Sequence, residues 1–136
     1  MENENEYVSK ELSIDADAIL LINNDGDEFD TIGMAPRFLF YLDHESKNLV
    51  LAVRGTTSFK DIMIDVAATE EPFLDGFAHQ GILKGARLVL GEVLSLLLKC
   101  LQKYPDYGVV VTGHSLGGGT AVLITLILLQ VTFHLK

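Results

Sequence analysis

One stretch of sequence decides the predicted fold: Val109-Val110-Val111-Thr112-Gly113-His114-Ser115-Leu116-Gly117. Its first half, with Tyr107 and Gly108 before it, is β-branched and mostly apolar on both faces, which is typical of a central strand in a parallel sheet. Apolar residues then continue from Leu116 to about His134 and predict a helix. The sequence therefore predicts a buried strand, a sharp turn that carries Ser115, and a helix.

The elements before this stretch indicate an α/β arrangement. Two short apolar runs, Phe38–Leu42 and Leu49–Val53, flank a polar turn and predict a β-hairpin. Residues Ile82–Lys103 carry apolar side chains at a spacing near 3.6, which predicts an amphipathic helix. Because a long helix between strands makes a right-handed crossover, we expect an α/β sandwich.

The remaining segments carry weaker local signals. Residues 14–22 are apolar at mixed spacing and are compatible with a helix. Ser58 is a candidate N-cap for a short helix that runs to about Val66. Residues 67–81 contain proline, glycine and scattered acids, so we expect a loop there.

Length and charge limit the class of protein. The chain has 136 residues, enough for one compact domain, and 49% of them are hydrophobic. Its net charge of −9 resides in the first 30 residues, which hold ten Asp and Glu against one Lys. We therefore expect an acidic, disordered leader at 1–13 and a partial domain at 14–136. Nucleic-acid binding is not expected, because it needs a positive surface for phosphates.

Several features bear on compartment and cofactors. The single cysteine, Cys100, excludes an internal disulfide and fits a reducing compartment. The acidic start is not a secretory signal, and the apolar stretch 121–133 is shorter than the roughly 20 residues of a membrane-spanning helix. We expect an intracellular protein. Membrane association, where it occurs, is expected of a longer parent protein. The Asp-rich residues 25–30 lack the ligand spacing of a calcium loop, so we expect no metal and no cofactor.

The serine in Gly113-His114-Ser115-Leu116-Gly117 is a candidate nucleophile. A serine hydroxyl attacks carbonyl carbon only when a base takes its proton, and a sharp strand-to-helix turn exposes it to such a base. Gly113 and Gly117 leave room where a Cβ would collide with neighbouring chain. The Leu116 N–H, at the positive end of the next helix, is a candidate donor to the oxyanion. The alternative is a tight glycine turn without chemistry.

A second polar segment, Arg54-Gly55-Thr56-Thr57-Ser58, leaves the predicted strand at Val53. An oxyanion hole needs a second donor, which a loop at the end of a neighbouring strand supplies. Alone, this segment is better explained as a polar loop that caps the next helix. Its occurrence together with the serine turn favours the functional interpretation.

Three ordered motifs resemble the class 3, fungal-type lipase domain, and within it the diacylglycerol lipases. They are Leu49-Val50-Leu51-Ala52-Val53-Arg54-Gly55-Thr56-Thr57-Ser58 with Asp61 and Asp65, then His79-Gln80-Gly81, then Val110-Val111-Thr112-Gly113-His114-Ser115-Leu116-Gly117-Gly118-Gly119. The resemblance runs from about Phe38 to Leu129.

The resemblance implies an α/β-hydrolase fold and hydrolysis of acyl esters in glycerolipids, with contact to a membrane or lipid surface. It implies that Ser115 is the nucleophile, that Thr56 and Leu116 form the oxyanion hole, and that Asp65 supports the oxyanion loop. The family's lid corresponds to residues within about 63–78, for which an ordinary surface loop is the alternative. His79 and His114 match positions that are not the base.

The chain departs from the family pattern after Ser115. The triad order in this fold is Ser, Asp, His, yet no Asp follows Ser115 and the single later histidine is His134. Along a helix, His134 would lie roughly 25–30 Å from Ser115. The sequence thus predicts an α/β-hydrolase fold truncated after the helix that follows the serine turn. We expect the chain alone to be impaired as an enzyme; the alternative is a catalytically silent pseudo-lipase that binds lipid or a partner.

Overall fold

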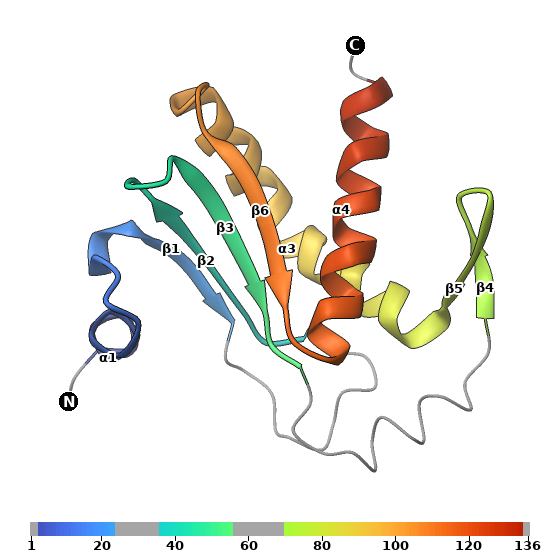
Figure 1. The fold of residues 1–136 in the computed structure, drawn as a ribbon, viewed down its shortest axis with the longest axis horizontal. Helices are drawn as coiled ribbons and strands as arrows, with labels where there is room; N and C mark the ends of the chain where they lie inside the picture. Colours follow the sequence, from blue (N-terminus) through green and yellow to red (C-terminus); the bar gives the residue numbers. More distant parts are fainter. Residues whose placement is uncertain (1–2, 24–35, 56–69, 135–136) are drawn as a thin grey trace.

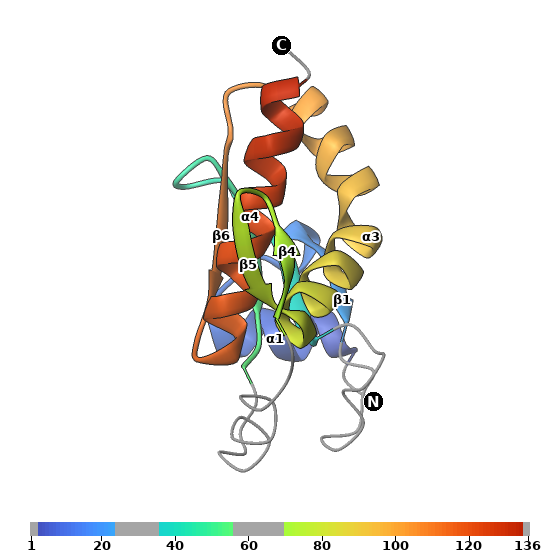
Figure 2. The same cartoon turned by 90° about the vertical axis from the view of Figure 1, so that its right-hand side faces the viewer.

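The described residues, 3–23, 36–55 and 70–134, form a sheet with two long helices on one face in this computed structural model (Figure 1). The sheet has the order β1 (Ile19–Asn23), β2 (Phe38–Asp43), β3 (Asn48–Val53) and β6 (Gly108–Gly113). Neighbours are antiparallel from β1 to β3, and β3 is parallel to β6. Helices α3 (Gln80–Lys103) and α4 (Leu116–His134) lie on the same side of β6 (Figure 2).

The core lies between the sheet and the two helices. Strand β2 buries every second residue, as a strand with one covered face should. Phe40, which is 1% exposed, lies opposite Leu51 of β3 in the register of the two strands. Both side chains belong to one cluster with Val89 and Val93 of α3. Ile124 joins this cluster from α4. The predicted hairpin and the crossover from β3 through α3 to β6 are therefore confirmed.

Helix α3 begins two residues earlier than its apolar pattern predicts. The side chain of His79 is the N-cap, and its Nδ1 accepts a hydrogen bond from the Ile82 N–H at 3.2 Å. This bond satisfies one of the N–H groups that a helix start leaves without a carbonyl partner. The helix ends at Lys103, before Pro105, as predicted.

Three local predictions are wrong. Residues 4–12, expected to be disordered, form helix α1 (Glu4–Leu12) with a capping box at Asn3. Residues 14–22 form a short 3₁₀ turn and strand β1 instead of a helix, because β1 pairs with β2 in the sheet. The expected loop at 67–81 contains strands β4 (Glu70–Phe73) and β5 (Gly76–His79), which form an antiparallel hairpin. The predicted helix from Ser58 lies outside the described residues.

Strand β6 also differs from its prediction. Its sequence is that of a central strand, yet among the described strands it is the edge of the sheet, and its residues are exposed or half-buried. Helix α4, formed as predicted, is apolar all round its circumference in sequence, and its outward face is exposed as well. The large apolar residues exposed on these two elements are Val109, Val110, Val122, Leu126, Leu129 and Val131.

We expect this apolar face to make the chain self-associate. An unpaired strand edge beside an apolar patch is a template for pairing with another chain. Replacing Val122 and Leu129, which are 58% and 61% exposed, with lysine should shift the protein toward monomer in sedimentation velocity experiments. Leu98→Lys on α3 is the control and should leave the distribution unchanged. A monomeric unmodified chain at micromolar concentration would contradict the prediction.

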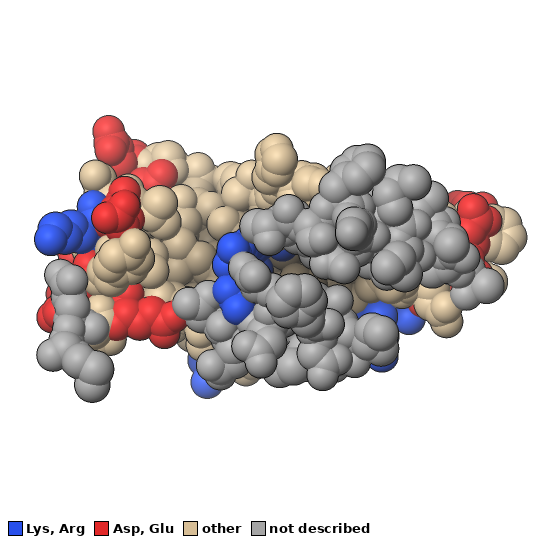
Figure 3. Space-filling model, turned by 90° about the horizontal axis from the view of Figure 1, so that it is seen from below, with Lys and Arg blue, Asp and Glu red and all other residues tan. Residues whose placement is uncertain are grey.

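Charge is unevenly distributed over the described surface. Exposed acidic residues gather at the end of the molecule that carries α1 (Figure 3); they are Glu4, Glu6, Glu11, Asp15 and Asp17. None of the described helices has the combination of length and hydropathy that a membrane span requires.

Candidate active site

Ser115 occupies a sharp turn between the end of β6 at Gly113 and the start of α4 at Leu116. Its φ is 56°, a left-handed conformation that costs a non-glycine residue roughly 1–2 kcal/mol. The residue is exposed. The N–H of Gly117 donates to the carbonyl of His114 at 3.0 Å, and the N–H of Gly119 donates to the carbonyl of Ser115 at 3.2 Å. The turn therefore holds Ser115 at the surface in a strained, hydrogen-bonded backbone.

Close backbone packing explains the glycines of this turn. A Cβ on Gly113 would lie 2.3 Å from the carbonyl carbon and oxygen of Gly117. A Cβ on Gly117 would lie 2.3 Å from the carbonyl oxygen of Val53, at the end of β3. Both contacts involve backbone atoms, which cannot rotate away. The glycines thus let helix α4 begin directly against β6 and β3.

Gly55 is a site residue that the sequence reasoning did not single out. A Cβ there would lie 2.2 Å from the carbonyl oxygen of His114, so the segment leaving β3 touches the serine turn. The available signal was the glycine inside Arg54-Gly55-Thr56, because glycine after a strand often marks a close approach of two backbones. Thr56 and Asp65, the other predicted members of this site, lie outside the described residues.

The first turn of α4 offers backbone donors beside Ser115. The N–H of Leu116, the first of α4, has no intrahelical carbonyl partner and lies at the positive end of the helix dipole. The hydroxyl of Thr120, which is 2% exposed, donates to the carbonyl of Leu116 at 3.0 Å and so ties the first turn together. This arrangement can stabilise an anion that develops next to Ser115.

The histidines are placed by different elements. His114 is part of the turn and is exposed, while His79 caps α3. His44 lies in the β2–β3 turn, where its Nδ1 is 2.6 Å from the hydroxyl of Tyr107. Tyr107 precedes β6 and Ser115 follows it, so the strand separates His44 from Ser115 by roughly 25 Å. His44 is therefore not beside the serine.

The pKa values of Cys100 and Asp43 are shifted, but neither shift indicates a second nucleophile or a catalytic acid. Burial raises the pKa of the Cys100 thiol, with the charge of Lys103 acting against it, so this buried thiol stays protonated and packs in the core. Hydrogen bonds from the side chain and backbone of Ser46 lower the pKa of Asp43. The same hydrogen bonds hold the β2–β3 turn together. Within the described part of the chain, no three His, Cys, Asp or Glu side chains gather as a metal site would require.

A groove with a volume of about 320 Å³ runs beside the serine turn, between β6 and α4. Its lining is mostly apolar and consists of Val111, Thr112, Gly113, Gly118, Ala121, Val122, Thr125 and Leu126. The larger groove, of about 460 Å³, lies between the β4–β5 hairpin, α3 and α4, and its lining does not include Ser115. The apolar groove next to the turn is thus the smaller of the two.

The crossover from β3 to parallel β6 and the serine at the strand-to-helix turn define an α/β-hydrolase fold, as predicted. A solved triacylglycerol lipase, whose catalytic centre is formed by a serine protease triad, has this fold. It is 27% identical with a TM-score of 0.69, and the alignment covers 83% of this chain and 42% of that one. The family follows from the sequence: residues 50–135 match the model of Lipase (class 3), so the chain belongs to the class 3 lipase family and is by family a carboxylic ester hydrolase.

Two relatives agree with this assignment. Diacylglycerol lipase-beta of Mus musculus is 35% identical over 99 residues, which are 67% of this chain and 15% of the relative. A lipase of Rhizomucor miehei is 33% identical over 105 residues, which are 75% of this chain and 28% of the relative. The chain thus spans less than a third of the length of either relative.

Proposed function

We propose that the chain carries the nucleophile and oxyanion site of a serine hydrolase that cleaves acyl esters of glycerolipids. The observation that carries the proposal is the exposed Ser115 at φ 56° between a parallel strand and a helix N-terminus. The names of the relatives, a diacylglycerol lipase and a fungal lipase, support a glycerolipid substrate. Such a substrate resides at a membrane or lipid surface, so contact with that surface is part of the proposal.

In the proposed reaction, Ser115 Oγ attacks the ester carbonyl carbon while a base takes the hydroxyl proton. The carbonyl oxygen becomes an oxyanion, which the N–H of Leu116 and the donor at Thr56 stabilise. Collapse of this intermediate breaks the bond to the alcohol oxygen, which leaves with the proton from the base. Water then hydrolyses the acyl-serine ester and releases a fatty acid.

The proposed oxyanion site draws support from the contact between Gly55 and the serine turn. Gly55 packs against the carbonyl of His114, and Thr56 is the next residue in the chain. In the proposal, Asp65 supports this loop from further along the chain.

Among the described histidines outside the serine turn, neither His79 nor His44 lies beside Ser115 to act as the base, and no Asp follows Ser115 in the sequence. His79 is engaged at the start of α3, and His44 lies at the opposite end of β6. We therefore propose that the 136-residue chain alone retains the oxyanion site and at most residual hydrolysis. Loss of a triad member leaves roughly 10³–10⁴-fold catalysis over water in serine proteases. A silent lipid-binding domain is the alternative.

The test compares the chain with Ser115→Ala, using a short-chain nitrophenyl ester, a dispersed diacylglycerol and a fluorophosphonate probe. We expect slow hydrolysis that the alanine variant loses, because the variant has no Oγ to attack the carbonyl. Equal rates in the two proteins would refute hydrolysis by Ser115 in this chain. Vesicle binding without any hydrolysis would favour the silent domain. Fluorophosphonate labelling that survives Ser115→Ala would refute the assignment of Ser115 as the nucleophile.

A further inference from the structure

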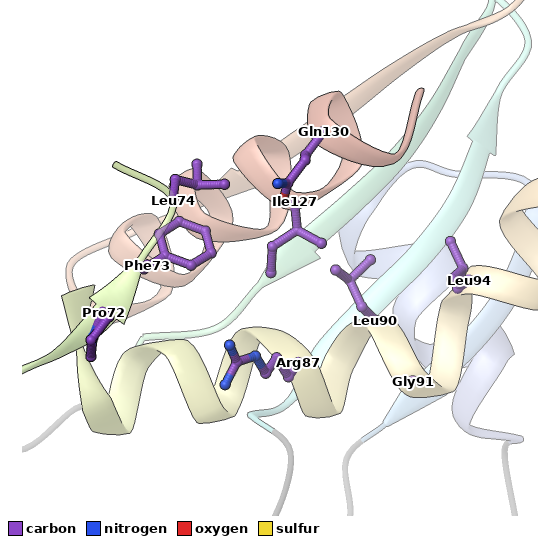
Figure 4. A pocket seen from close by; sticks show the side chains of 9 residues that line it. All are labelled: Pro72, Phe73, Leu74, Arg87, Leu90, Gly91, Leu94, Ile127 and Gln130. Atoms are coloured by element: carbon purple, nitrogen blue, oxygen red, sulfur yellow. The ribbon is translucent and has the colours of Figure 1, made fainter. Parts of the chain in front are cut away.

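The larger groove lies away from the serine turn and is built by three elements (Figure 4). Leu90 and Arg87 extend into it from α3, Ile127 from α4, and Phe73 from β4. Its volume of about 460 Å³ is within the range of small-molecule sites, roughly 300–1,000 Å³. It is mostly apolar, so its occupant must be mostly apolar as well.

A glycine in the middle of α3 keeps this groove open. Gly91 lies eleven residues inside the helix, where glycine is unfavourable because it gains no packing and loses more backbone entropy than other residues. A Cβ there would meet no described atom within 4 Å. Close packing therefore does not require this glycine, whereas a larger side chain at this position would occupy part of the groove. Gly91 is thus explained if the groove has an occupant.

Charge is placed at one end of the groove. The guanidinium of Arg87 lies toward the hairpin, and the apolar lining continues along α3 to Leu94, about 10 Å further along the helix axis. Arg87 Nη1 is 3.3 Å from Glu71 Oε1, and both side chains are partly exposed, 58% and 31%. An ion pair this exposed is weak, and a guanidinium has five donors, so a second carboxylate can join or replace Glu71.

We propose that this groove binds the anion of a long-chain fatty acid. The carboxylate pairs with Arg87, and the acyl chain lies over Leu90 and Ile127 toward Leu94. Charge complementarity favours this occupant over a neutral lipid, because Arg87 is the one charged residue in the lining and its ion pair with Glu71 is exposed and weak. The proposal concerns binding only and does not depend on hydrolysis at Ser115.

The test is a calorimetric titration of the 136-residue chain with oleate, at oleate concentrations below the critical micelle concentration. One oleate per chain is expected. Monoolein, which has the same acyl chain and no charge, should bind about tenfold more weakly than oleate. Arg87→Gln should lower the affinity for oleate by a similar factor. Glu71→Gln should raise the affinity for oleate by up to about fivefold, because it removes the carboxylate that competes for Arg87. Gly91→Leu should abolish saturable binding.

The controls separate this groove from the apolar surface beside Ser115. Val122→Gln changes the smaller groove and should leave oleate binding unchanged. Ser115→Ala should also bind oleate normally, so failure of the proposed hydrolysis leaves this proposal standing. Gly91→Leu should keep the circular dichroism spectrum of the parent chain, because its side chain points into open space. Equal binding of oleate and monoolein, binding that survives Gly91→Leu, or loss of binding in Val122→Gln would overturn the proposal.

Discussion

Replacing Gly117 with alanine is expected to lower the free energy of unfolding by about 3 kcal/mol or more, at the upper end for overpacked sites. The added Cβ would lie 2.3 Å from the carbonyl oxygen of Val53 and 2.8 Å from the amide nitrogen of Gly55. Both are backbone atoms, so relief requires the end of β3 to move away from α4. The same movement separates the segment leading to Thr56 from Ser115, so labelling of Ser115 by a fluorophosphonate should fall too.

Gly91→Ala is the matched control for this prediction. Gly91 is also helical, but its added Cβ meets no described atom within 4 Å. Because alanine is the better helix former, this variant should raise the free energy of unfolding by about 0.5–1 kcal/mol. Urea unfolding, monitored by circular dichroism, measures the free energy of unfolding of both alanine variants. If the two alanine variants had similar stability, the close approach of α4 to β3 would be wrong.

Replacing Phe40 with alanine is the second large effect, with an expected loss of about 3–5 kcal/mol. Phe40 is 1% exposed and lies in the cluster between the sheet and α3. Its removal leaves a cavity that the surrounding strands and helix can fill only in part. A loss of this size is comparable with the whole stability of a small domain, so the variant should unfold at much lower urea concentration.

Phe77→Ala is the control, because the phenyl ring of Phe77 on β5 is 72% exposed. Removing it leaves no cavity, so the free energy of unfolding should change by less than about 0.5 kcal/mol. Thermal unfolding of the two variants at equal concentration distinguishes them. Comparable losses would mean that β2 does not contribute to the core in the way described.

The part of the fold that depends on local pattern was predictable. The hairpin of β2 and β3, helix α3 and the strand-turn-helix around Ser115 each follow from periodicity and turn residues within a short window. Even there, the first two residues of α3 were missed, because the pattern of apolar residues carries no information on the cap that His79 provides. The two glycines of the serine turn were correctly predicted to sit where a Cβ would collide.

Other elements depend on partners distant in sequence. Residues 19–23 are apolar at mixed spacing, and only pairing with β2 makes them a strand. The β4–β5 hairpin has Leu74 at a positive φ of 51° in its turn, a position for which glycine is the usual sequence signal. Gly55 gained its role only when β3 was brought beside the serine turn.

By itself, the sequence determined the family, because residues 50–135 match the class 3 lipase family. It also predicted the serine between strand and helix, because glycine placement and apolar periodicity act over a few residues. The tertiary structure alone decided which backbones meet. It made Gly55 a neighbour of His114, left β6 at the edge of the described sheet, and joined α3, α4 and the hairpin around a second groove. These features arise from contacts between segments far apart in the chain, and no local pattern of residues encodes them.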